Sequence, residues 1–81
     1  MPKLKPPHPG EVLREEFLTP LGLSAAQLAK AIGVPPTRIE QLVAEQGELS
    51  PSLALLLARH LGTTTDFWMA LQSRHERERA S

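Results

Sequence analysis

Apolar residues recur at helical spacing along the chain, and no segment alternates with the two-residue period of a strand. This pattern predicts an all-α fold with five helices, at about residues 10–18, 25–31, 35–45, 51–61 and 64 onward. Pro20 and Gly22 are expected to end the first helix, and Gly33 and Gly62 the second and fourth. The charged residues 73–81 are expected to continue the last helix.

Hydroxyl residues stand where three of these helices are expected to begin. Ser24, Ser50 and Thr64 are suited to be N-caps, because their side-chain oxygen can accept a hydrogen bond from a backbone N–H of the first turn. Pro36 and Pro51 fit the first turns of the third and fourth helices, where a missing N–H costs nothing. Apolar residues nearly encircle the fourth helix, so we expect it to be central and buried on most sides.

Residues 28–42 have the spacing of a helix-turn-helix motif. Leu28 and Ala29 share one helix face, Gly33 supplies a tight turn, and Ile39 and Leu42 give the next helix a buried stripe. The second helix of such a motif enters a DNA groove. An ordinary pair of helices with no DNA role has similar intervals, so this alternative stays open at this point.

The candidate DNA-binding residues lie at the starts of the two helices of this motif. They are Ser24, Gln27, Pro36, Thr37, Arg38 and Gln41. Arg38 is the strongest candidate, because a guanidinium can bind either a base edge or a phosphate. The alternative is that these polar side chains only solvate an exposed helix face, with Arg38 paired to a neighbouring glutamate.

The composition limits the chemistry. Nine basic residues balance nine acidic ones, unlike a protein that holds nucleic acid mainly by charge. Without cysteine the chain has neither disulfides nor thiolate metal ligands. His8, His60 and His75 are too scattered to indicate a metal site, and His60 is expected to be a partly buried structural residue. No phosphate-binding loop or catalytic spacing is present, which predicts a protein that is not an enzyme and needs no cofactor.

The length predicts one small domain. We expect residues 1–8 to form an extended Pro-rich arm and residues 9–81 a single domain with a C-terminal dimerisation helix. A core of this size is often completed by a second copy, and the expected homodimer contacts are Phe67, Trp68, Leu71 and Gln72. No apolar run is long enough for a membrane span or a signal peptide, so a cytoplasmic protein with no membrane partner is expected.

Several short motifs together carry a family resemblance. They are HPGEVLREEFL at residues 8–18, PLGLS at 20–24, GVPP at 33–36 with Arg38 and Ile39, Gly62 with Thr63, and FWMALQ at 67–72. In this order and without a gap, they resemble HigA-type antitoxins of the Xre helix-turn-helix superfamily. The resemblance implies a five-helix domain of the lambda-repressor-like helix-turn-helix type. It also implies a dimer that neutralises a RelE-like ribonuclease toxin and binds operator DNA at its own promoter.

The chain departs from the family pattern on the expected DNA surface. Ala25 stands where members usually have a glutamine that helps to hold a phosphate, and Glu40 replaces a small polar residue. The loop after the third helix is commonly basic and glycine-rich, but here it contains Glu45 and Glu48. Each missing cation removes about one unit of counterion release. The alternative function is therefore a stand-alone transcriptional regulator or protein-interaction module with a weakened DNA-binding face.

Overall fold

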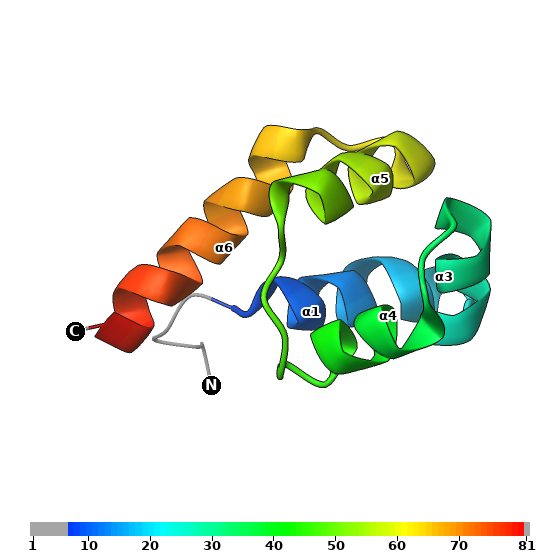
Figure 1. Ribbon diagram of the computed structural model, residues 1–81, viewed down its shortest axis with the longest axis horizontal. Coiled ribbons are helices and arrows are strands. Elements are labelled where there is room, and N and C mark those ends of the chain that lie inside the picture. Colours follow the sequence, from blue (N-terminus) through cyan, green and yellow to red (C-terminus); the bar gives the residue numbers. More distant parts are fainter. Residues whose placement is uncertain (1–6, 81) are drawn as a thin grey trace.

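The computed structural model describes residues 7–80, and the elements in that range are all helical. The first helical segment consists of α1 (Pro9–Val12), the π-helix η1 (Leu13–Leu18) and α2 (Thr19–Leu21), which follow one another without a break. The other helices are α3 (Ala25–Ile32), α4 (Pro36–Val43), α5 (Pro51–Leu61) and α6 (Thr65–Ala80). Since the first segment is continuous, the structure has the five helices that the sequence predicts (Figure 1). Most of the predicted arm, residues 1–6, lies outside the described residues.

The first helical segment runs through Pro20, so the prediction that this proline ends the helix is wrong. The segment ends two residues later, at the predicted Gly22, whose φ is 68°. In a regular α-helix a proline ring collides with the carbonyl four residues before it. Here the preceding turn is wider, and the N–H of Thr19 donates to the carbonyl of Arg14, five residues back. The wider turn also brings Leu13 and Leu18, five residues apart, into the core.

Helices α3 and α4 form the predicted helix-turn-helix. Oγ of Ser24 accepts a hydrogen bond from N–H of Gln27 (3.0 Å), and N–H of Ser24 donates to Oε1 of Gln27 (2.8 Å), which is a reciprocal capping box. Gly33, with φ 78°, ends α3, and Pro36 opens α4. The apolar residues that define the motif are all buried at the contact between the two helices: Leu28, Ala29, Ile39 and Leu42. The predicted pairing of these helices is confirmed.

Helix α5 has the predicted bounds but is less buried than expected. It directs Leu53, Ala54, Leu57 and Ala58 into the core and leaves Leu55 45% exposed. The expectation of burial on most sides is wrong, because in so small a bundle the other helices cover only one face of α5 (Figure 1).

Helix α6 completes the core with Trp68, which is fully buried. Its indole Nε1–H donates to Oγ1 of Thr63 (2.7 Å), and its ring lies 5.4 Å from that of Phe17. Thr64 caps the helix as predicted, by accepting a hydrogen bond from N–H of Phe67 (3.1 Å). The predicted extension of this helix through the charged residues is confirmed to Ala80, and its last turns project beyond the other helices (Figure 1). None of the helices described is long and apolar enough to cross a membrane.

Candidate nucleic-acid interface

Helix α4 presents one polar face to solvent. Its buried residues are Ile39 and Leu42, and the exposed ones are Pro36, Thr37, Arg38, Glu40 and Gln41. The exposed set contains all four of the DNA-binding candidates predicted on this helix, together with the acidic Glu40. A short helix with its apolar stripe inward and its polar residues outward has the form that enters a major groove.

The side chain of Arg38 extends from the first turn of α4 to the start of α5. Its Nη2 donates to Oγ of Ser50 (3.3 Å), the residue that caps α5 by accepting from N–H of Leu53 (3.2 Å). Oγ of Ser52 is 3.3 Å from Oγ of Ser50. A guanidinium has five N–H donors, so this single contact orients Arg38 and leaves donors for a base edge or a phosphate.

The capping box fixes the other two candidates, Ser24 and Gln27, at the start of α3. Because Oε1 of Gln27 accepts from the backbone of Ser24, the orientation of its carboxamide is set within the protein. No partner for Nε2 of Gln27 occurs among the described residues, so this group can donate to a ligand at the exposed start of α3. The main role of Ser24 is to cap α3, and this cap holds Gln27 in place.

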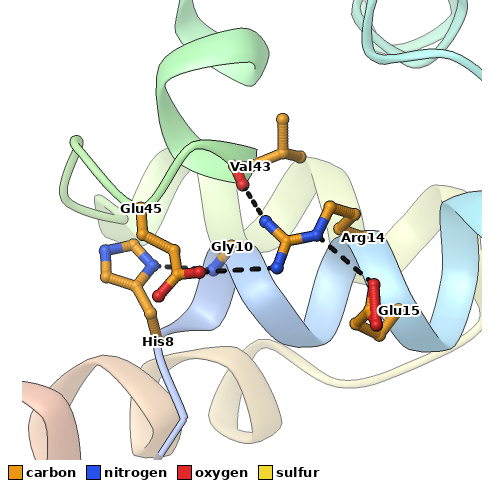
Figure 2. A network of polar contacts seen from close by, with 6 residues as sticks. All are labelled: His8, Gly10, Arg14, Glu15, Val43 and Glu45. Atoms are coloured by element: carbon orange, nitrogen blue, oxygen red, sulfur yellow. Dashed lines mark hydrogen bonds and ion pairs between the residues drawn. The ribbon is translucent and has the colours of Figure 1, made fainter.

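The C-terminal end of α4 is held by the first helical segment (Figure 2). Gly10 packs directly on the main chain of Leu42, and a Cβ at Gly10 would overlap the Leu42 carbonyl. His8 is 5% exposed, and its Nδ1 accepts a hydrogen bond from N–H of Gly10 (2.9 Å). Its Nε2 lies 3.0 Å from the carbonyl oxygen of Gly47 in the loop after α4.

Arg14 contacts the same end of α4 from one turn further along the first segment (Figure 2). Its Nη1 donates to the carbonyl of Val43, the last residue of α4. Nη2 pairs with Oε2 of Glu45 and Nε with Oε2 of Glu15, both at 3.4 Å. Glu45 has the left-handed φ of 61°, at a position where glycine is usual. Nothing in the sequence near Arg14, His8 or Gly10 indicates these contacts.

The four residues predicted as dimer contacts differ in exposure. Phe67 is 40% exposed and Leu71 is half-buried, whereas Trp68 and Gln72 lie inside the protomer. Oε1 of Gln72 accepts from N–H of Leu49 (3.0 Å), and Nε2 donates to Oε1 of Glu76 (3.0 Å). Only Phe67 and Leu71 therefore have side-chain surface for a second copy.

The histidines also differ from expectation. His60 is exposed, not partly buried, because it lies on the outward face of α5. The rings of His8 and His75, which are far apart in the sequence, are in edge contact at 4.5 Å between centroids. Within residues 7–80, no group of three or more potential ligand side chains has the arrangement of a metal site.

Comparison with known proteins gives consistent matches. Residues 13–68 match the family model described as Helix-turn-helix. Virulence-associated protein I of Dichelobacter nodosus is 46% identical over 69 residues, which are 85% of this chain and 64% of that protein. Antitoxin HigA-1 of Vibrio cholerae is 39% identical over 70 residues, which are 86% of this chain and 66% of that protein. The chain thus spans slightly less than two thirds of these curated relatives.

A solved structure is similar over nearly the whole chain. It is the Pseudomonas aeruginosa antitoxin HigA with the higBA promoter, which superimposes with a TM-score of 0.92 and 41% identity. The match covers 94% of this chain and 83% of that one.

Proposed function

Because this chain belongs to the Xre-type helix-turn-helix family, together with the HigA antitoxins, we propose that it is the antitoxin of a type II toxin–antitoxin pair. It neutralises a RelE-like ribonuclease toxin and, as a homodimer, binds double-stranded operator DNA at its own promoter. The observation that carries this proposal is the close likeness, in fold and in sequence, to a HigA antitoxin solved with its promoter.

In this proposal α4 is the recognition helix. Its exposed Thr37, Arg38 and Gln41 reach base edges in the major groove, and Pro36 adds an apolar contact at the edge of this surface. At the start of α3, the capping box between Ser24 and Gln27 directs the Gln27 amide to a backbone phosphate. Gln27 thereby supplies a phosphate contact close to Ala25, where the family pattern has a different glutamine.

The homodimer forms through α6 and the surface beside it. Phe67 and Leu71 contribute the exposed apolar area, while Trp68 and Gln72 hold α6 in place from within the protomer. A two-fold pair of helix-turn-helix domains places its recognition helices about 34 Å apart, one turn of DNA.

The test separates DNA binding from toxin binding. Arg38→Ala is expected to weaken binding to a promoter fragment by about 1–3 kcal/mol, the loss of one bidentate base contact. Binding of the toxin is expected to be unchanged, because the two functions use different surfaces. Fluorescence anisotropy with the promoter fragment measures the first, and co-purification with the product of the adjacent gene measures the second.

Arg59→Ala is the matched control, since it removes the same charge from the exposed surface of α5. Equal losses of both activities in Arg38→Ala contradict the separation of surfaces. Promoter binding with no toxin in the adjacent gene favours the stand-alone regulator.

A further inference from the structure

Helix α4 depends on neighbouring elements for its position. It has eight residues, fewer than an isolated helix needs to be stable in water. The first helical segment and its N-cap residue contact three main-chain carbonyl groups, those of Leu42 and Val43 at the C-terminal end of α4 and that of Gly47 in the loop after it. The contacting residues are Gly10, Arg14 and His8, respectively.

Glu45 makes this end of α4 unusual. It follows the helix in a left-handed conformation that a residue with a side chain adopts under strain. Its carboxylate is directed back to Arg14, and the two side chains are 41% and 39% exposed. The pair is therefore partly shielded from solvent. The same guanidinium donates to the carbonyl of Val43, the last residue of α4, and to the Glu45 carboxylate.

Arg14 forms ion pairs with two carboxylates. Its guanidinium lies 3.4 Å from Glu15 as well as from Glu45. Removal of Arg14 would leave two carboxylates at the contact between η1 and the end of α4. Negative charges next to a recognition helix repel DNA phosphates.

Resting on the proposed promoter binding, we infer that Arg14 is a positioning residue for DNA recognition. It fixes the C-terminal end of α4 through the Val43 carbonyl and holds the Glu45 carboxylate against η1, so that this charge does not face the duplex. The planar fork of a guanidinium serves both partners at once, whereas the single ammonium of a lysine cannot reproduce this geometry.

The main experiment is the affinity for a promoter fragment, measured by fluorescence anisotropy at a temperature where every variant is folded. Arg14→Ala is expected to weaken binding roughly fivefold or more. Fivefold is about the smallest change in affinity that is typical when one site affects binding at another. Arg59→Ala, which removes the same charge on α5, is expected to leave the affinity within about twofold, as for surface substitutions away from such contacts. Arg14→Lys is expected to lie between wild type and Arg14→Ala.

A second variant separates the effect of the Glu45 charge from the packing role of Arg14. Glu45→Gln removes the carboxylate and keeps the side-chain size, and in the Arg14→Ala background it is expected to restore part of the lost affinity. If Arg14 had only a packing role, Glu45→Gln would raise the affinity no more in the Arg14→Ala background than in the wild-type background. If Arg14→Ala/Glu45→Gln binds as weakly as Arg14→Ala, the inference about the Glu45 charge is overturned.

The free protein gives an independent measurement. N–H of Glu45 donates to the carbonyl of Leu42 (3.0 Å) and N–H of Gln46 to that of Gln41 (2.9 Å). Hydrogen exchange at these two amides is expected to accelerate in Arg14→Ala and not in Arg59→Ala. Unchanged exchange overturns the positioning role whether or not DNA is bound.

The outcomes also separate this inference from the proposed function. If the wild-type protein does not bind the promoter, the proposed function fails, and the DNA role of Arg14 fails with it. If the wild type binds and Arg14→Ala binds equally well, the inference alone is overturned.

Discussion

Gly10 supports helix α4 because it has no side chain. The main chains of α1 and α4 meet at this residue, and any Cβ would overlap the carbonyl of Leu42. The same close approach brings His8 within hydrogen-bonding distance of Gly47. The absence of a Cβ at Gly10 therefore permits the other contacts at this end of α4.

We predict that Gly10→Ala lowers the free energy of unfolding by about 1–3 kcal/mol, because the backbones must separate to admit the methyl group. The measurement is urea denaturation followed by circular dichroism. Gly47→Ala is the control: its Cβ would meet its nearest neighbour, Cβ of Gln41, at an ordinary 3.7 Å. A change within about 0.5 kcal/mol is expected for the control. Equal stability of Gly10→Ala and wild type contradicts the prediction.

At the scale of helices, local signals predicted the starts and ends well. Ser24, Ser50 and Gly62 act where the sequence placed them, because caps and left-handed turns depend on a few consecutive residues. At Pro20 the local rule fails, because it assumes regular α geometry and the π-helical turn before this proline removes the conflict. The internal position of Gln72 could not be predicted, because it depends on how α6 packs against the segment before α5.

The role of Gln72 leads to a prediction about α6. Gln72→Leu keeps a side chain of similar size but leaves the buried N–H of Leu49 without its acceptor. The free energy of unfolding is expected to fall by about 1–3 kcal/mol, the cost of an unsatisfied buried donor. Thermal denaturation of Gln72→Leu beside Ser73→Ala, an exposed neighbour, measures this. An unchanged midpoint for Gln72→Leu would show that Leu49 finds another partner.

At the scale of the whole molecule, the most informative contacts join residues that are far apart in the sequence. His8 and Gly47 are 39 residues apart, Arg14 and Val43 29, and Leu49 and Gln72 23. The exposed surface of α4 could be predicted from periodicity, since burial of Ile39 and Leu42 determines which residues face outward. The residues that hold α4 could not, because nothing near Arg14 in the sequence indicates a partner at the far end of another helix.

The exposed apolar residues lead to a prediction about assembly. Phe67→Ser is expected to raise the dissociation constant of the proposed homodimer about tenfold. Full burial of a phenylalanine is worth roughly 1.5–3 kcal/mol, and each of the two copies has 40% of this side chain left to bury. Leu21→Ser, at the end of α2, is the control, because Leu21 is 60% exposed and lies outside the proposed contact. Light scattering over a micromolar concentration series measures both. A wild-type monomer at every concentration, or equal effects of the two substitutions, contradicts the prediction.

The contacts that hold α4 have a consequence for how this protein can evolve. Gly10, Arg14 and His8 all contact main-chain carbonyl groups, of Leu42, Val43 and Gly47, and every residue type has such a group. The outward side chains of α4 take no part in these three contacts. Under the proposed function, mutations at Thr37, Glu40 or Gln41 therefore change which base sequence α4 prefers, while the contacts that support the helix stay the same. Selection on DNA specificity and selection on folding then act on largely separate sets of residues.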